Sequence, residues 1–446
     1  MTRLSTALFS AMALGATLVA QTPAAKPLDI YVVDTEGGKA ALFVSPTGQS
    51  LLIDSGSPGG RDTDRLMAAV TEAGLKQIDY LISTHYHVDH IGGMAELVKR
   101  IPVGTFIDHG PSVEEREQVQ GFAASYAELY GKAKHLVVKP GDKIPITGLD
   151  WRIVTAGGNV LKTPLPGGGR ANPLCADFKP KEITNDPENA QSVGSVVTLG
   201  QFRAADFGDL LWNKEHELMC PNNLIGTIDL FMVSHHGLDQ SNAPVLVQAL
   251  QPRVAVMQNG TRKGAGTETM PTLRSSPGLE DIWQLHWSYG AGIEQNSAGV
   301  YIANIDDNAT IAGILTAPPR QGGPGRGAAG PGAGGPPAGG PPAGGPPAGG
   351  APGGAPGAAP TGAAPAAGAA PAPPPPMPPA GAPAAGAGAT PAGAPQGAPG
   401  AGRGGGAAAH SPAYMIKISA RPDGSFTVTN TRNGFTKTYA ARPRAR

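Results

Sequence analysis

The chain lacks net charge, because its 34 Lys and Arg residues balance its 34 Asp and Glu residues. It also lacks runs of basic residues. Tight nucleic-acid binding needs clustered Lys and Arg at the phosphates, and attachment to a membrane surface needs a polybasic patch. The sequence therefore gives no signal for either partner.

Cysteine is nearly absent, with only Cys175 and Cys220 in the chain. In an oxidising compartment the two could form one disulfide. Sequence separation does not show that their Cα atoms are close, so two separate buried thiols are the alternative. A serine nucleophile in a G-x-S-x-G turn is also missing, as is a Walker-type phosphate loop.

Long hydrophobic runs are missing except near the start, where Arg3 precedes an apolar stretch over residues 4–19 that ends in small residues. This pattern predicts a signal peptide over residues 1–20, cleaved near Ala20, and a secreted or periplasmic protein. A membrane anchor is the alternative, although the stretch is short and Ala-rich for a bilayer span. No later segment predicts a transmembrane helix.

Glycine and proline are abundant instead, at 65 and 46 residues, and most of the excess lies in residues 317–411. Such a Gly/Pro/Ala block cannot bury enough apolar surface to offset the entropy of ordering, so it is predicted to be disordered. Strand patterns resume behind it. We therefore expect a main domain over residues 28–316, a disordered insertion, and a C-terminal β-hairpin over residues 412–446 that returns to that domain.

Polar clusters follow several predicted strands. Residues 78–83 read as a strand that runs into Thr-His-Tyr-His-Val-Asp-His, and residues 92–100 behind it read as a helix. Further strands over residues 201–205 and 228–233 lead to Asp-Phe-Gly-Asp and Ser-His-His-Gly. Strand, loop and helix in this order predict an α/β protein with its site at the carboxyl ends of strands. Residues 298–306 read as another strand.

The His-x-His-x-Asp-His pattern is the strongest chemical signal. His85 and His87, separated by one residue, can turn both imidazoles to one cation, and Asp89 and His90 can supply a second one. Imidazole and carboxylate ligands suit zinc, and also iron or manganese. The pattern predicts a binuclear centre, with two zinc ions as the expected cofactor.

Further ligands should come from other strand ends. Asp209 is placed to bridge both metals, with Asp206 as its competitor, because the glycine before Asp209 permits a tight turn. A terminal ligand is expected from His235 or His236. Adjacent residues at a strand end point to opposite sides, so the other imidazole would contact substrate or pack.

These motifs resemble the metallo-β-lactamase superfamily, and the segments YVVDTEGGKAALFVSP and ENAQSVGSVVTLG are similar to its ComEC competence-protein branch. The resemblance covers roughly residues 28–259 and implies an αββα sandwich. It implies His85 and His87 on one metal, Asp89 and His90 on the other, and a bridging Asp209. Many members supply a third His to the first metal, but residues 187–192 contain none; His109 and His135 lie further upstream.

The expected function is that of an exported hydrolase. A metal-activated hydroxide would attack a phosphodiester or an ester or lactone, and Asp89 would orient the nucleophile and pass on its proton. The expected partner is a small ester or phosphoester substrate. The alternative is a non-catalytic exported protein that keeps the fold and binds a metal or another ligand.

Overall fold

The computed structural model describes residues 26–131, 133–183, 186–290, 292–305 and 412–442. The predicted signal peptide and the predicted Gly/Pro/Ala insertion lie outside the described residues. The description below concerns the unit formed by the segments before and after that insertion.

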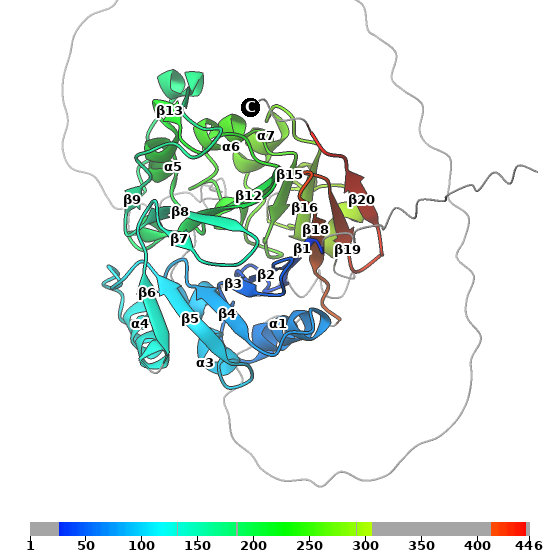
Figure 1. Cartoon of the computed structure of the whole chain (residues 1–446). Helices are drawn as coiled ribbons and strands as arrows, with labels where there is room; N and C mark the ends of the chain where they lie inside the picture. The colour runs from blue at the N-terminus through cyan, green and yellow to red at the C-terminus, as the bar shows by residue number, and fades with distance from the viewer. Residues whose placement is uncertain (1–25, 132, 184–185, 291, 306–411, 443–446) are drawn as a thin grey trace, which may run out of the picture. The chain divides into compact units, whose positions relative to one another are not determined.

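One mixed sheet combines the start and the end of the described chain. Its strand order is β20-β19-β18-β1-β2-β3-β4-β5-β6. The strands are β1 (Leu28–Val32), β2 (Ala41–Val44), β3 (Ser50–Ile53), β4 (Ile78–Ile82), β5 (Val103–Asp108), β6 (Lys134–Val137), β18 (Ile416–Ala420), β19 (Phe426–Asn430) and β20 (Thr436–Tyr439). β18 pairs antiparallel with β1, and Figure 1 shows these red-brown strands beside the blue N-terminal strand.

A second sheet has the order β17-β16-β15-β14-β12-β11-β8-β7, and β9 pairs with β8. Its strands are β7 (Lys143–Ile144), β8 (Asp150–Ala156), β9 (Asn159–Val160), β11 (Gly194–Leu199), β12 (Phe202–Asp206), β14 (Leu230–Met232), β15 (Val254–Met257), β16 (Asp281–His286) and β17 (Ile302–Asn304). The short strands β10 (Arg170–Ala171) and β13 (Asn222–Asn223) pair separately.

Three buried clusters define four layers. Side chains alternate between the two faces of each strand, so Ile30, Phe43, Trp151 and Val254 point into a core between the two sheets. The other face of the first sheet packs on α1 (Arg61–Glu72), α3 (Met94–Leu97) and α4 (Glu117–Tyr130). The other face of the second packs on α5 (Trp212–Met219), α6 (Pro244–Leu250) and α7 (Thr269–Arg274). Figure 1 shows the same arrangement, and the predicted αββα sandwich is confirmed.

Several local predictions need correction. The helix expected over residues 92–100 shortens to the single turn α3, which follows another short turn, α2 (Val88–Ile91); between them, a Cβ at Gly92 or Gly93 would meet backbone atoms of Val88 or Ser55. The strand expected over residues 298–306 shortens to β17, since η5 (Gly299–Tyr301) precedes it. The other 3₁₀ turns are η1 (Pro173–Asp177), η2 (Asn189–Gln191), η3 (Ser234–Gly237) and η4 (Ile293–Gln295). Cys175 and Cys220 form a disulfide that ties η1 to the end of α5.

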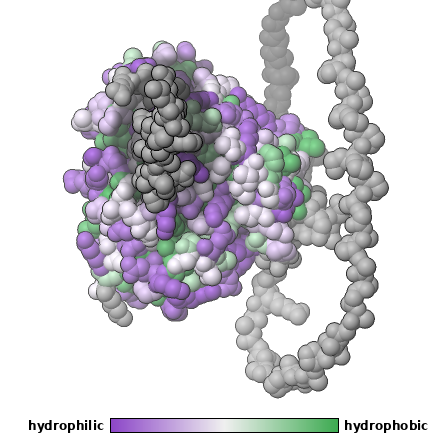
Figure 2. Space-filling model, turned by 45° about the vertical axis from the view of Figure 1, so that its right-hand side comes forward, coloured by the Kyte–Doolittle hydropathy of each residue, from purple (hydrophilic) through white to green (hydrophobic). Residues whose placement is uncertain are grey.

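The surface of the described part shows small, scattered hydrophobic groups. On the face drawn in Figure 2, hydrophilic residues predominate among those coloured. Only Val113, Val137, Ile293, Val300 and Ile305 are large hydrophobic side chains that stand exposed in the described ranges. No helix in these ranges has the length and apolar character needed to cross a membrane.

Candidate metal centre

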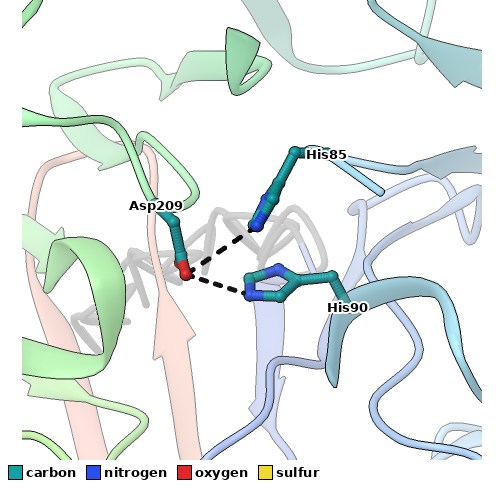
Figure 3. Close-up of side chains that lie close together, drawn as sticks. All are labelled: His85, His90 and Asp209. Carbon is teal, nitrogen blue, oxygen red and sulfur yellow. Dashed lines mark ion pairs between the residues drawn. The ribbon is translucent and has the colours of Figure 1, made fainter. Parts of the chain in front are cut away.

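Four segments from both sheets bring the predicted site residues together. His85 and His87 follow β4, while Asp89 and His90 lie in α2. Asp209 follows β12, and the remaining two histidines lie in η3 after β14. Figure 3 shows His85, His90 and Asp209 pointing toward one another, with Asp209 coming from the opposite side of the group.

Asp209 Oδ2 is the centre of the cluster. It lies 3.2 Å from His90 Nε2, 3.3 Å from His236 Nε2, 3.5 Å from His235 Nε2 and 3.9 Å from His85 Nε2. All of these residues are buried. One carboxylate therefore faces four imidazoles, as the predicted bridging position requires.

The same ligands fall into two groups. His85, His90 and Asp209 offer ligand atoms close enough for one cation, and Asp89, His90 and His236 do so for another. Asp89 Oδ2 lies 3.4 Å from His236 Nε2 and 3.8 Å from His90 Nε2. His87 Nδ1 lies 3.0 Å from His85 Nε2. The metal-ligand roles of these seven residues stay a prediction, but the fold brings all of them to one place.

Second-layer partners orient three of the imidazoles. His90 Nδ1 lies 2.8 Å from Asp54 Oδ2, His85 Nδ1 lies 3.1 Å from Thr84 Oγ1, and His236 Nδ1 donates to the Gln258 carbonyl at 3.1 Å. Each ring then turns its Nε2 to the centre. A carboxylate or carbonyl behind a histidine is the usual support of a metal ligand, because it fixes the tautomer.

The backbone of η3 explains the two adjacent histidines. His235 and His236 have φ angles of 51° and 56°, in the left-handed region. The expectation that they point to opposite sides, as in a strand, is wrong, because both Nε2 atoms lie within 3.5 Å of Asp209 Oδ2. Left-handed backbone at two successive non-glycine residues is uncommon and is found at functional sites.

Asp206 and Asp209, the two candidates for the bridging position, have different partners. Asp206 Oδ1 accepts a hydrogen bond from Lys39 Nζ at 2.7 Å, in a buried ion pair. Gly208, with a φ of +59°, turns the chain between them, and a Cβ there would meet Thr84 at 2.8 Å. The turn places Asp209, and not its competitor, among the histidines.

The electrostatics of the centre call for added positive charge. Burial lowers the pKa of His85, and burial lowers that of His235 to about 3, so both rings are neutral. The pKa of Asp209 falls well below its usual value, since the neighbouring His90, His236 and His235 outweigh its burial. Burial opposes protonation of His90, but the carboxylates of Asp209, Asp54 and Asp89 raise its pKa to about 10.

These donors fit divalent cations. Asp209 Oδ1 is buried and has no hydrogen-bond partner among the described residues, and the neutral rings of His85 and His235 and the ionised Asp209 are in the protonation states that bind metal. Nitrogen and oxygen ligands of this kind suit zinc, manganese or iron. By proximity, His85, His90 and Asp209 would hold one ion, and Asp89, His90 and His236 the other.

Five residues around the centre escaped sequence analysis. Asp186 Oδ1 lies 3.7 Å from His87 Nε2, and Asn189 Nδ2 lies 3.3 Å from His235 Nε2, in the region where a third His is missing. Arg116 Nη2 lies 2.9 Å from His87 Nε2 and also pairs with Glu114. Lys263 Nζ lies 2.5 Å from Asp89 Oδ2. Asn189 lies in the ENAQSVGSVVTLG segment, whereas the other four lie on connecting segments without a motif.

Three further histidines have structural partners outside the centre. His109 Nε2 lies 2.9 Å from Glu188 Oε1, and His135 Nε2 lies 2.6 Å from Asp108 Oδ2. His286 Nε2 lies 2.6 Å from Asp34 Oδ1, in the core. None of the three belongs to a group of candidate metal ligands in the described ranges. Cys220 is engaged in the disulfide.

Two layers of helices around two sheets, with a His/Asp centre at the strand ends, define a class of metal-binding α/β proteins. The family model described as the metallo-beta-lactamase superfamily matches residues 34–170. The resemblance to this superfamily that the sequence motifs predict is confirmed over these residues.

Similar curated proteins include a competence protein and a hydrolase. The competence protein ComA of Neisseria gonorrhoeae is 24% identical over 226 residues, which cover 50% of this chain and 26% of that protein. The hydroxyacylglutathione hydrolase of Idiomarina loihiensis is 27% identical over 90 residues, 20% of this chain and 28% of the relative. The chain thus spans about a quarter of these curated relatives. The predicted competence-protein branch is confirmed.

Among solved structures, the metallo-beta-lactamase fold protein YhfI from Bacillus subtilis is similar at 13% sequence identity. The match covers 58% of this chain and 96% of that one, with a TM-score of 0.36. The layers described above define the fold independently of this likeness.

Proposed function

We propose that the chain is an exported metal-dependent hydrolase with two divalent cations, zinc in the first instance, acting on phosphodiester or ester substrates. The observation that carries this proposal is the convergence of four imidazole Nε2 atoms on Asp209 Oδ2. The superfamily includes hydrolases among the relatives of this chain, such as the hydroxyacylglutathione hydrolase.

The chemistry is that of water attack on an ester or phosphoester. Bound divalent cations lower the pKa of a water molecule and stabilise negative charge that develops on the attacked group. Asp89 is the proposed catalytic carboxylate, which orients the attacking water and passes its proton onward. Burial would raise the pKa of Asp89, but Lys263, His90 and His236 outweigh it and keep this group ionised.

Export rests on the N-terminal apolar stretch and is compatible with the disulfide. Disulfides persist in oxidising compartments and are rare in the cytosol. The Cys175–Cys220 bond therefore supports a secreted or periplasmic location.

A non-catalytic metal- or ligand-binding protein is the second candidate. It is favoured by the absence of a third His in residues 187–192, where Glu188 instead pairs with His109. Such a protein would contain stoichiometric metal and show no turnover on any ester.

The test is hydrolysis of bis-p-nitrophenyl phosphate and p-nitrophenyl acetate by the full chain before and after chelation. We expect activity that disappears with the metal and returns on addition of zinc or manganese. His85→Ala should lose it, whereas His135→Ala, whose ring contacts Asp108 outside the centre, should keep it. Full metal content without activity would favour the second candidate.

A further inference from the structure

Two cationic side chains flank the metal centre, and each contacts a different predicted ligand. Arg116 Nη2 lies 2.9 Å from His87 Nε2, at the start of α4. Lys263 Nζ lies 2.5 Å from Asp89 Oδ2, in the loop after β15. Their side chains are 31% and 29% exposed, so both reach solvent as well as the centre.

We propose that Arg116 and Lys263 together bind the anionic oxygens of a phosphoester group in a small substrate, an inference that rests on the proposed hydrolase function. An uncharged ester presents no anionic oxygen in its ground state to the two flanking cations. A phosphoester offers at least two anionic oxygens, which a planar guanidinium and a compact ammonium bind well.

The contacts of Arg116 support a role beyond fixing α4. His87 Nδ1 faces His85 Nε2, so Nδ1 is the atom directed toward the first cation. If Nδ1 gives its lone pair to a cation, the neutral ring carries its proton on Nε2. Nε2 then cannot accept from Arg116, whose Nη2 keeps Glu114 as a partner and has Asp186 Oδ1 3.9 Å away. Arg116 Nε is buried and has no hydrogen-bond partner in the part of the chain that the structure describes. A substrate oxygen would satisfy this donor, while Glu114 keeps the guanidinium in place.

The charge of the rest of the molecule limits the size of the substrate. Positive and negative residues balance over the whole chain, and no basic run accompanies these two residues. Long nucleic acids need an extended row of cations along their backbone. The local pair therefore fits a small phosphoester.

The experiment measures binding of inorganic phosphate to the zinc-loaded full chain by calorimetry. Arg116→Met and Lys263→Met should each weaken phosphate about 10- to 100-fold, the usual worth of a charge-assisted hydrogen bond. Matched controls are Arg152→Met and Lys417→Met, since these residues pair with Asp150 and Glu72 and have side chains 39% and 29% exposed. The controls should bind phosphate like the wild type.

Zinc content is measured for every variant, because Lys263 also contacts Asp89. If Lys263→Met loses zinc, Lys263→Arg, which keeps the charge, must retain both zinc and phosphate, and Arg116→Met then decides. In Arg116→Met, the KM for bis-p-nitrophenyl phosphate should rise, while that for p-nitrophenyl acetate stays unchanged. Wild-type phosphate affinity in Arg116→Met with full zinc would overturn the proposal.

The outcomes separate this inference from the proposed function. If phosphate binding depends on both cations but no ester is hydrolysed, the anion-site proposal stands and the hydrolase proposal is wrong. If both substitutions leave the hydrolysis of both esters unchanged, the hydrolase proposal stands and the anion-site proposal is wrong.

Discussion

At the scale of single residues, local sequence spacing located most of the centre. His85, His87, Asp89 and His90 lie within one turn region, so their proximity follows from the chain itself. Partners brought in by the fold, such as Asp54 behind His90, could not be predicted, because their contacts depend on which strands become neighbours. The common orientation of His235 and His236 depends on their left-handed backbone, which the residue types at these positions do not predict.

The two adjacent histidines should differ in their effect on metal binding. His236 Nε2 lies 3.2 Å from His90 Nε2 and 3.4 Å from Asp89 Oδ2, inside the second group of ligands. His235 Nε2 lies 3.3 Å from Asn189 Nδ2 and 3.5 Å from Asp209 Oδ2, outside the second group of ligands. We expect His236→Ala to lose about one metal per chain, and His235→Ala to keep the second ion. Elemental analysis of both variants checks this, and an equal loss in both would contradict it.

Asp34 should make stability depend on acid pH. Burial would raise its pKa, but His286 and Arg65 outweigh burial and lower it to about 2. A carboxyl with a lower pKa in the folded state stabilises the protein above its unfolded pKa, near 4, and loses this effect as pH falls toward 2.

Asp34→Asn should therefore reduce the free energy of unfolding by about 2 kcal/mol at pH 6, and the difference from wild type should shrink as pH falls below about 4. Urea unfolding across this range measures it. Asp64→Asn, at an exposed pair with Arg100, is the control and should show little change. A difference that stays constant with pH would be evidence against this role of Asp34.

At the scale of elements, buried strands with continuous apolar runs were predictable, and polar or short ones were not. The sequence predicted β12 and β14 together with the turns that follow them. The sequence did not predict β20, because an edge strand needs few apolar residues. Its sequence is TKTY, and only Tyr439 is fully buried. The segments between β4 and β11 mix short strands and 3₁₀ turns that depend on long-range contacts.

The Lys39–Asp206 pair joins the two sheets beside the centre. Both side chains are buried, and Lys39 precedes β2 while Asp206 ends β12. Lys39→Ala should lower the free energy of unfolding by about 3–5 kcal/mol, because it leaves a buried carboxylate without its partner. Lys417→Ala, which breaks a partly exposed pair, should cost about 0–1 kcal/mol. Equal costs in urea unfolding would contradict this account.

At the scale of the whole molecule, the segments on either side of the Gly/Pro/Ala block meet. Tyr414 N donates to Asn304 Oδ1 at 2.9 Å, and Asn304 Nδ2 donates to the Tyr414 carbonyl at 3.0 Å. Composition could predict where the block begins and ends. It could not predict that β18 would lie next to β1, because that pairing joins residues far apart in the chain.

Deletion of residues 317–411, with a short Gly/Ser linker, should therefore leave metal content and cooperative unfolding unchanged. A chain that stops at residue 316 should not fold, since it lacks β18 to β20 and exposes the apolar core around Ile418, Phe426 and Val428. Thermal unfolding and elemental analysis compare the two. Loss of metal in the internal deletion would show that the block contributes to the domain.

The most direct test of the account is metal content in Asp209→Asn against Asp206→Asn, both purified like the wild type. Asp209 faces four imidazoles, whereas Asp206, three residues away and equally buried, accepts from Lys39, which an Asn oxygen can still do. The account predicts about two metals per chain in the wild type and in Asp206→Asn, and a clear loss in Asp209→Asn. Near-zero metal in the wild type, or full metal in Asp209→Asn, would contradict a binuclear centre built around Asp209.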